Sequence, residues 1–580
     1  MIDSQTTLVA LVDEGLASNH SGLAMSCKYG AEWRETTTDE FAQAAREIGL
    51  GLYALGVRHG DSVAIHSENR TEWLMADLGS LSIGAVSVPV YATQPADQIK
   101  YILEHAEATA LFVSTDKMWA ASGQYADEFS DMHLIGFDGE FHDRMMTLAD
   151  LRKKGAALDK KQPELFDQLK AALKPSDIAS ITYTSGTTGV PKGVMLSHSN
   201  LCHTVLASKG RSFYAGNSGP DDRVLSFLPL AHIFEHASSY GSLYLGIPMY
   251  MLSNVDTLLE DIQYVKPVHF ATVPRLLEKI YGSIQAKVGT ATGLQGKIGK
   301  WALGVAAKYE VDKAPGLAHK LADKLVFSKF RALMGGNIQG ITSGGAALSP
   351  DICKFFCAIG VPVGEGYGLT ETSPGISVYV PDQLRPGSVG KPLPEVEVKI
   401  AEDGEILARG PNIMQGYLKM PKQTAEVINS EGWFHTGDIG HLDEDGFLFI
   451  TDRKKELFKL STGKYVAPAP VENQMIASPY IDQVVVVGNS QKFCGAIIHP
   501  AMDMINGTLG DDVTDEQIHA LITEEVIKAN EGLSHWEQVK KFALISDPMT
   551  IETGELTPTM KRKRTQINKM RKVEIDQIYT

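Results

Sequence analysis

The sequence predicts an α/β protein: a large N-terminal domain of two parallel-type α/β sheets plus a small antiparallel β subdomain, followed by a small mobile α+β C-terminal domain. Short apolar strands alternate with amphipathic helices up to about residue 380. From about residue 381, glycine turns join short strands. A chain of 580 residues is also too long for one hydrophobic core and suits two to four domains.

The first α/β block is expected over about residues 1–180. Its clearest element is a helix over 37–55, which Thr37 or Thr38 can cap and whose apolar residues share one face. A strand, a helix, a strand, a helix and a strand follow, at 62–65, 70–83, 85–90, 96–106 and 109–114. These strands are nearly continuous apolar runs, which indicates burial on both faces of a parallel sheet.

The second block, about 181–380, repeats this alternation, with candidate strands at 223–227, 247–252, 268–273, 338–342 and 361–364. The β subdomain, about 381–453, has candidate antiparallel strands at 396–400, 406–409 and 447–450. The charge run from Asp452 to Glu456 is typical of an exposed domain boundary. We therefore expect an N-terminal domain over 1–453 and a C-terminal lid domain over 454–580.

Composition and charge exclude several classes of protein. The net charge of −16 argues against a general nucleic-acid binder. Five scattered cysteines argue against a disulfide framework and fit a reducing compartment, so we expect a cytoplasmic protein. Cys353 and Cys357 lie one turn apart in a predicted core helix, and no second pair accompanies them as a metal site would require. The N-terminus lacks the basic region of a signal peptide, and the most apolar stretch, 240–252, is too short to span a bilayer.

Residues 285–331 interrupt the second block with a helix-prone sequence that contains nine Lys and Arg against three acids. Such a segment is either a solvated helical insertion or a surface for anionic lipid or coenzyme phosphates. The second alternative predicts peripheral contact with the inner face of a membrane.

The most informative stretch is 181–196, ITYTSGTTGVPKGVML, in which a loop joins two strand-like runs. The loop offers backbone amides, hydroxyls, glycines and the ammonium of Lys192, which together suit a polyphosphate. Walker A is excluded because Lys192 follows a proline, precedes no Ser or Thr and opens no helix. The alternative interpretation is an ordinary surface turn rich in Ser, Thr and Gly.

Four later stretches complement this loop. Small residues at 343–347 leave room for a flat ring against the backbone. GEGYGLTE at 364–371 adds an aromatic face, a hydroxyl and a carboxylate at the carboxyl end of a strand, where open α/β sheets bind ligands. GWFHTGD at 432–438 is predicted to place Asp438 on a tight turn, where a carboxylate suits bidentate capture of ribose hydroxyls. The fourth stretch is Asp452-Arg453 with KLSTGK at 459–464.

In this order, the stretches resemble the adenylate-forming superfamily of acyl-CoA synthetases, luciferases and peptide-synthetase adenylation domains. The resemblance covers roughly residues 30–570 and rests on YTSGTTGVPKG, YGLTE, GWFHTGD and DRKKE. VPRLLEKIY at 273–281, the basic insertion and the terminal LTPTMKRKR are most similar to long-chain fatty acid–CoA ligases. This resemblance implies ATP-dependent activation of a fatty acid to acyl-adenylate with release of pyrophosphate. Thioester formation with coenzyme A and release of AMP would follow.

The resemblance also implies the roles of individual residues toward ATP, Mg²⁺ and coenzyme A. Catalytic roles fall to Lys561, which would bridge the carboxylate and the α-phosphate, and to Thr184 and Glu371, of which Glu371 would hold Mg²⁺. Lys455 falls at the hinge about which the lid rotates. The nucleotide-binding residues that it implies are Thr184, Ser185, Gly186, Thr187, Thr188, Gly189, Lys192, Gly344, Gly345, Ala346, Glu365, Gly366, Tyr367, Gly368, Thr370, Asp438, Arg453 and Lys561.

Some positions depart from the family. Leu277 stands where thermophilic long-chain enzymes have a bulky aromatic that gates the acyl tunnel, so gating differs or passes to a neighbour. The stretch 335–339 lacks the arginines that relatives often have, and Met560 stands where shorter-chain relatives have glycine. On its own, the basic run 561–564 would be interpreted as a solvated surface, and only its place in the order of motifs indicates catalysis.

Rival hypotheses come from other classes. The run from His232 to His236 matches the zinc-peptidase motif H-x-x-E-H, in which both histidines would share a helical face. An adenylating ligase that loads a separate carrier protein, or a CoA ligase for a medium-chain or aromatic acid, would share most of the motifs. The intact site residues disfavour a silent lipid-binding relative. We therefore expect small-molecule partners (fatty acid, ATP and CoA), no nucleic acid, and a monomer or homodimer.

Overall fold

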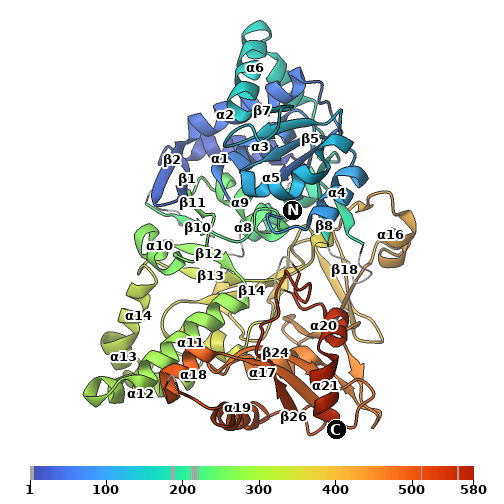
Figure 1. Ribbon diagram of the computed structural model, residues 1–580. Helices are drawn as coiled ribbons and strands as arrows, with labels where there is room; N and C mark the ends of the chain where they lie inside the picture. The colour runs from blue at the N-terminus through green and yellow to red at the C-terminus, as the bar shows by residue number, and fades with distance from the viewer. Residues whose placement is uncertain are drawn as a thin grey trace.

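The computed structural model describes residues 5–184, 190–209, 211, 219, 221–510, 512–557 and 561–580. Two large sheets form the N-terminal part, and the C-terminal residues, orange to red in Figure 1, pack beneath them. The predicted fold class is confirmed: two mainly parallel α/β sheets, a small antiparallel sheet and an α+β C-terminal domain. The residues 185–189 of the predicted phosphate loop lie outside the described residues.

The first large sheet has the strand order β19-β9-β8-β4-β3-β5-β6-β7. Its strands are β3 (Ser62–His66), β4 (Val86–Val90), β5 (Ala108–Val113), β6 (His133–Gly136), β7 (Met145–Thr147), β8 (Ile178–Thr184), β9 (Lys192–Ser197) and β19 (Gly416–Tyr417). The segments around it are α2 (Thr38–Ala54), α3 (Thr71–Ser82), α4 (Ala96–His105), α5 (Asp116–Ser122), η1 (Gly123–Glu128), α6 (Leu148–Lys161) and α7 (Leu165–Ala171). Thr37 caps α2, because its Oγ1 accepts a hydrogen bond from the Glu40 amide at 3.2 Å.

The second large sheet has the order β16-β15-β14-β13-β12-β10-β11-β1-β2. Its strands are β1 (Leu23–Tyr29), β2 (Glu32–Thr37), β10 (Val224–Ser226), β11 (Met249–Leu252), β12 (His269–Thr272), β13 (Gly340–Ser343), β14 (Val363–Tyr367), β15 (Ser377–Val378) and β16 (Lys391–Pro392). Helices α1 (Leu8–Ser18), α8 (His198–Lys209), α9 (Ile233–Tyr244), α10 (Leu258–Val265) and α15 (Pro350–Ala358) accompany it. The sheets do not divide the chain at residue 180, since β1 and β2 join the second sheet while β8 and β9 join the first.

The basic insertion is helical, as its composition indicates. It runs through α11 (Pro274–Thr290), α12 (Gly293–Ala307), α13 (Leu317–Ala322), the π-helical segment η2 (Asp323–Phe327) and α14 (Ser328–Leu333). In Figure 1 these light-green helices project to one side of the second sheet, close to the lid. Small residues such as Gly299 and Ala302 let α12 pack closely, and Phe327 anchors η2 in the same core.

The small antiparallel sheet consists of β17 (Glu397–Ile400), β18 (Glu405–Arg409), β20 (Phe434–Leu442) and β21 (Leu448–Arg453), with α16 (Pro421–Val427) beside it. The lid contains β22 (Phe458–Lys459), β23 (Tyr465–Val466), α17 (Pro468–Ile476), β24 (Ile481–Val487), β25 (Cys494–Pro500), α18 (Met502–Leu509), α19 (Asp515–Ala529), β26 (Val539–Leu544), α20 (Arg564–Met570) and α21 (Lys572–Tyr579). Strand β20 differs from the prediction, which assigned a turn to its first half.

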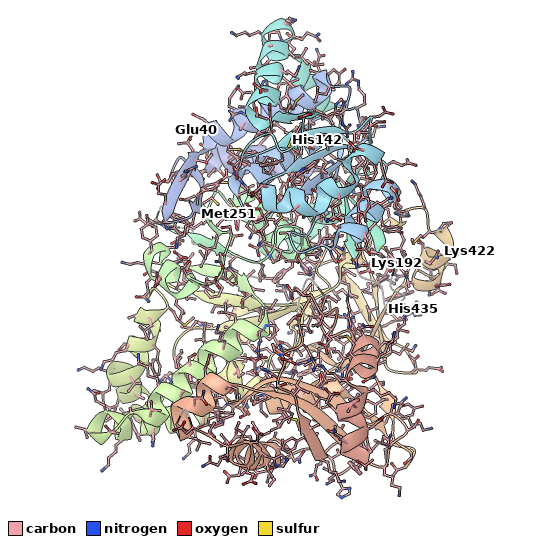
Figure 2. All side chains as sticks on the ribbon, viewed as in Figure 1. Glu40, His142, Lys192, Met251, Lys422 and His435 are labelled. Atoms are coloured by element: carbon pink, nitrogen blue, oxygen red, sulfur yellow. The ribbon has the colours of Figure 1, made fainter. Side chains whose placement is uncertain are left out.

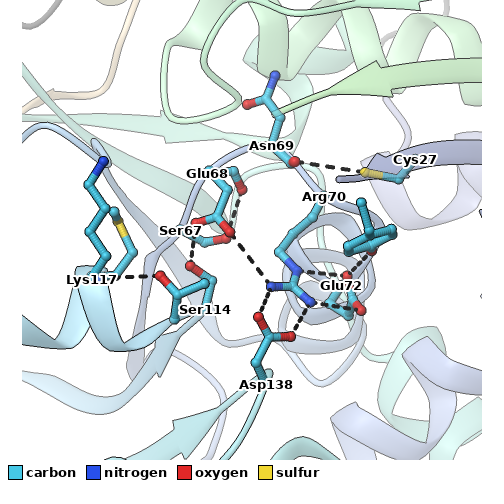
Figure 3. A network of polar contacts seen from close by, with 12 residues as sticks. Cys27, Ser67, Glu68, Asn69, Arg70, Glu72, Ser114, Lys117 and Asp138 are labelled. Atoms are coloured by element: carbon cyan, nitrogen blue, oxygen red, sulfur yellow. Dashed lines mark hydrogen bonds and ion pairs between the residues drawn. The ribbon is translucent and has the colours of Figure 1, made fainter. Parts of the chain in front are cut away.

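A buried charged network fixes the turn between β3 and α3 (Figure 3). The Arg70 guanidinium, 4% exposed, donates to Asp138 at 2.6 and 2.9 Å and to Glu72 at 2.9 and 3.1 Å. The neighbouring Asn69 side chain donates to the Leu228 carbonyl at 2.7 Å and accepts from the Leu230 amide at 2.9 Å. The first sheet thereby holds in place a segment that lines the central cavity described below.

Among the residues that the structure describes, no helix combines the length and the apolarity needed to pass through a lipid bilayer.

Candidate active site

A cavity of about 2260 Å³ lies between the second sheet, the small β sheet and the lid. Its walls combine an apolar part around Leu276, Ile280 and Met334 with a polar part at the carboxyl ends of the strands. The predicted site residues that line it are Gly345, Ala346, Gly366, Tyr367, Gly368, Asp438, Arg453, Lys455 and Lys561. The topology thus brings together residues up to 216 positions apart in the chain, counted from Gly345 to Lys561.

The predicted strand–loop–strand at 181–196 is an antiparallel hairpin. Thr184, at the end of β8, pairs with Lys192, at the start of β9. The Lys192 ammonium lies 4.8 Å from the centre of the Tyr417 ring. Figure 2 labels Lys192 and His435 on the side of the molecule that bears α16, between the blue subdomain and the lid.

Thr370 and Glu371 lie beside the cavity, on the 3₁₀ turn η3 (Thr370–Thr372). The Tyr417 hydroxyl donates to Glu371 Oε1 at 2.8 Å, and the Glu371 carbonyl accepts from the Met414 amide at 2.9 Å. Tyr417 therefore connects Lys192 with Glu371. No sequence motif points to this tyrosine, because it lies in a two-residue strand outside all of them.

The loop after β13 and the end of β14 together line one part of the cavity, which is called the slot below. Gly345, Ala346 and Tyr367 line the same cavity, and Tyr367 is buried. Gly368 has no room for a side chain, because a Cβ there would lie 1.6 Å from the Pro374 carbonyl oxygen. Gly344 packs behind the slot, against the Phe234 ring. A slot with a backbone wall and an aromatic wall suits a flat heterocycle.

Glu365 does not line the cavity. Its carboxyl accepts a hydrogen bond from the Leu348 amide at 3.0 Å, and burial raises its pKa to about 8. A protonated carboxyl is the form that an apolar site favours. The geometry therefore gives Glu365 a support role for the 343–349 loop and no contact with the slot.

Asp438 lies in β20, and the sequence prediction of a tight turn is wrong. Gly437, with φ +73°, lies in the bulged stretch of β20 between His435 and Ile439, where the pairing with β18 changes register, and the neighbouring Asp438 lines the cavity. The carboxylate accepts from the Tyr367 hydroxyl at 2.8 Å and faces the Arg453 Nε at 3.3 Å. Burial raises the pKa of Asp438, and the Arg453 guanidinium opposes that effect.

Lys561 belongs to the lid and lines the same cavity as Asp438 and Arg453. Its backbone closes a loop whose two ends are bonded: the Thr557 amide donates to the Lys561 carbonyl at 2.8 Å, and the Lys561 amide donates to Thr557 Oγ1 at 3.0 Å. The side chain is accessible within the cleft, yet protein surrounds it closely enough to lower its pKa to about 8. Desolvation is the main cause and the Arg453 cation adds to it, while Asp438, Glu371 and Glu456 act in the opposite direction.

Lys455 lies in the turn that follows β21 and lines the cavity between the small sheet and the lid. The preceding Lys454 amide donates to the Gly437 carbonyl at 2.8 Å. The lid also touches α11, since Arg275 forms an ion pair with Asp482 of β24. No sequence pattern indicates this pair, because its members are 207 residues apart.

The structure does not arrange His232, Glu235 and His236 as the zinc-peptidase motif requires. His232 lies before α9 and caps it, with its Nδ1 accepting from the Phe234 amide at 3.2 Å. His236 Nε2 is bonded instead to Asp77 Oδ2 at 2.8 Å, and Glu235 is buried. The two histidines therefore do not share a helical face. Leu277, the predicted gate position, is fully buried in the core, whereas its neighbours Leu276 and Glu278 line the cavity.

Two family models cover most of the chain. The model described as AMP-binding enzyme matches residues 15–418, and the model described as AMP-binding enzyme C-terminal domain matches residues 455–580. The chain therefore belongs to the family of AMP-binding enzymes, which use ATP and coenzyme A.

Within that family, the chain groups with the long-chain fatty-acid–CoA ligases. A long-chain-fatty-acid–CoA ligase of Mycobacterium bovis is 38% identical over 573 residues, which cover 94% of this chain and 92% of that protein. Long-chain-fatty-acid–CoA ligase 1 of Homo sapiens is 30% identical over 625 residues, which cover 100% of this chain and 87% of the human protein.

Solved structures share the fold at low sequence identity. The adenylation domain of a carboxylate reductase from Mycobacterium chelonae has a TM-score of 0.78 and 22% identity, covering 99% of this chain and 91% of that one. An anthranilate CoA ligase solved with anthranoyl-AMP has a TM-score of 0.72 and 19% identity, covering 98% and 97%. Both likenesses concern the fold alone.

Proposed function

We propose that this chain activates a long-chain fatty acid with ATP, forming acyl-adenylate and pyrophosphate, and then transfers the acyl group to the thiol of coenzyme A with release of AMP. The observation that best supports this function is the convergence of Tyr367, Asp438, Arg453 and Lys561 on one cavity with a long apolar wall. The slot suits adenine, Asp438 suits the ribose hydroxyls, and the apolar wall suits an alkyl chain. The curated relatives are named for the same reaction.

The reaction needs positive charge where two anions meet. The fatty-acid carboxylate must attack the α-phosphate of ATP, and we assign to Lys561 the neutralisation of both groups. We assign the β- and γ-phosphates to Lys192 and the Thr184 end of the hairpin, and the α-phosphate contact to Thr370. The loop from Ser185 to Gly189 keeps its sequence-based assignment as the phosphate loop.

Glu371 is the residue that we assign to Mg²⁺. Tyr417 orients one of its carboxylate oxygens, and Mg²⁺ is commonly bound by one or two carboxylates together with substrate phosphates. Within the described part of the chain, no group of three His, Cys, Asp or Glu could hold a metal without such phosphates. Bound there, the ion would supply charge neutralisation for the leaving pyrophosphate.

We also propose that the lid, residues 454–580, rotates about Lys455 between the two half-reactions. Lys561 belongs to the lid, whereas its partners Asp438 and Glu371 belong to the N-terminal domain. A lysine on a rotating domain can serve adenylation and then leave the site.

The function is tested by coenzyme A–dependent release of AMP across a series of saturated fatty acids of increasing length. We expect the largest kcat/KM for long-chain acids. Each added methylene that is buried in the apolar part of the cavity contributes about 0.8 kcal/mol to the binding free energy until the cavity is filled. Preference for a medium-chain or aromatic acid would contradict the assigned substrate. Acyl transfer only to a carrier protein would contradict the assigned acceptor.

The rate of adenylation is expected to fall above about pH 8. Lys561 must be protonated to bridge two anions, and its pKa in the free enzyme is lowered to about 8, so the active form is lost as the pH rises through that value. The measurement is kcat/KM for fatty-acid-dependent ATP–pyrophosphate exchange between pH 6 and 10. Lys561→Arg stays charged over this range, so its residual activity should lack this decline. A wild-type profile that stays flat to pH 10 would contradict the role of Lys561.

We further propose that the basic insertion makes peripheral contact with anionic membrane. Lysines on α12, α13 and η2 are exposed beside apolar residues such as Leu294 and Leu317, the latter 87% exposed. Each lysine near an anionic surface contributes about 1 kcal/mol to binding. Replacing Lys297, Lys300, Lys320 and Lys324 by Gln should therefore weaken sedimentation with phosphatidylglycerol vesicles at least tenfold at low salt.

The matched control replaces Lys153, Lys154, Lys160 and Lys161 of α6, at the opposite end of the molecule in Figure 1, and should bind like wild type. Equal binding of both variants, or binding that added salt does not weaken, would remove the proposed membrane surface.

A further inference from the structure

Lys561 is held at one end of a short strand-like segment that carries two arginines. Arg562 forms a bridge with Leu556, and the Lys563 amide donates to the Glu555 carbonyl at 2.8 Å. These backbone bonds join the 561–564 segment to residues 555–557. They do not determine how the segment is oriented against the rest of the lid.

Glu472 of α17 provides that orientation. Its side chain is fully buried, and its Oε2 accepts from Arg562 Nη1 at 2.9 Å and from Arg564 Nη2 at 2.7 Å. Its Oε1 accepts from the Val486 amide of β24 at 2.8 Å. One carboxylate thus connects helix α17, strand β24 at the edge of the lid sheet and both arginines that follow Lys561. Burial alone would raise the pKa of Glu472, but the two guanidiniums lower it, so the carboxylate stays ionised.

The Glu472 cluster is also connected to the hinge through Arg564. Arg564 Nε donates to Glu456 Oε2 at 2.9 Å, and Glu456 is the residue after Lys455. Arg564 therefore lies between a carboxylate of the lid core and a carboxylate at the hinge. A guanidinium suits this position because its planar fork can donate to two carboxylates in fixed directions.

We infer that Glu472 is a positioning residue for adenylate formation: through Arg562 and Arg564 it holds the segment that aims Lys561 at the site, and through Arg564 it couples that segment to the hinge at Glu456. The inference rests on the proposed two-step reaction. Glu472 contacts no reacting atom in this arrangement. Its effect is confined to the half-reaction in which Lys561 is used.

The lid also has apolar cores that do not depend on the charges of this cluster. Two apolar cores pack on the faces of its three-stranded sheet, one around Val484, Ile498 and Ile522 and the other around Ile497 and Ile567. Loss of the Glu472 charge should therefore displace the 561–564 segment, since the two guanidiniums would then repel each other, and leave the rest of the lid in place.

The test compares two half-reactions in the full-length Glu472→Gln variant. Fatty-acid-dependent ATP–pyrophosphate exchange should fall about 10- to 100-fold in kcat, because small misplacements of a catalytic group have effects of that size. The KM for ATP should change less than threefold, since the N-terminal domain holds the nucleotide. Formation of acyl-CoA from supplied acyl-adenylate and coenzyme A should stay within about threefold of wild type.

Glu555→Gln is the matched control. Glu555 is equally buried in the lid and pairs with Arg571 at 2.7 Å, but its side chain touches neither Arg562 nor Arg564. This variant should lose comparable thermal stability and keep both half-reactions. Glu456→Gln, at the exposed end of the cluster, provides a variant that is expected to fold normally and to lose adenylation to a smaller degree, with the thioester step unchanged.

Equal loss of both half-reactions in Glu472→Gln, in proportion to its folded fraction, would overturn the inference, as would adenylation at the wild-type rate. Wild-type protein that shows no fatty-acid-dependent exchange would instead refute the proposed function, so the two failures are distinguishable.

Discussion

Replacing Lys561 by Ala is expected to lower the rate of acyl-adenylate formation by about 10³-fold. Removing one preorganised charge or donor from a transition state typically costs 10²- to 10³-fold in kcat, and here two anions would meet without it. The Arg453 guanidinium remains in the site, but it already faces Asp438 at 3.3 Å. The measurement is fatty-acid-dependent ATP–pyrophosphate exchange under saturating substrates.

The same variant should keep most of the second step. Acyl-adenylate has a good leaving group in AMP, and the lid would have rotated Lys561 away before the thiol attacks. Acyl-CoA formation from supplied acyl-adenylate should therefore remain within a few-fold of wild type, which also demonstrates that the variant is folded. Adenylation that survives the substitution, or a thioester step that is lost with it, would show that Lys561 has a different role.

Replacing Asp438 by Ala is expected to raise the Kd for ATP about 100-fold. A hydrogen bond to a charged group contributes roughly 1.5 to 3 kcal/mol, and we assign both ribose hydroxyls to this carboxylate. The substitution also leaves the Tyr367 hydroxyl and the Arg453 guanidinium without their shared partner in a buried site. ATP affinity can be measured directly by calorimetry in the absence of fatty acid.

Tyr367→Phe is the control for this prediction. It removes the hydroxyl that donates to Asp438 at 2.8 Å and keeps the ring that forms one wall of the slot. We expect a loss of about fivefold in ATP affinity, which is the effect of one neutral hydrogen bond. A similar loss in both variants would mean that Asp438 acts by orienting Tyr367 and makes no contact with the ribose.

Much of the architecture follows from local patterns. The helix over 37–55, the parallel strands of the first block and the hairpin around the phosphate loop are all found close to their predicted bounds. These elements have strong apolar periodicity, clear caps or glycine-rich loops, which are properties of neighbouring residues. The sequence also supplied the order of motifs that indicates an adenylate-forming enzyme, since that order depends on no contact.

Other features depend on contacts between distant parts of the chain. Glu365 turns away from the cavity because the Leu348 amide, 17 residues earlier, is its nearest partner. Asp438 lies on a bulged strand because β18 and β21 pair on either side of it. His232 caps a helix, which separates it from His236, and the acyl-gate position Leu277 is buried in the core.

The sequence by itself therefore determined the fold class, most of the strands and helices, and the residue types that could bind a nucleotide and activate a carboxylate. The tertiary structure alone decided which of these side chains face one cavity, and it added Tyr417, the Arg275–Asp482 ion pair and the Glu472 cluster. The physical reason is the distance along the chain over which each kind of interaction acts. Backbone periodicity and turn chemistry act over a few residues, whereas burial, ion pairing and the direction of a side chain are fixed by partners that the fold brings from up to hundreds of residues away.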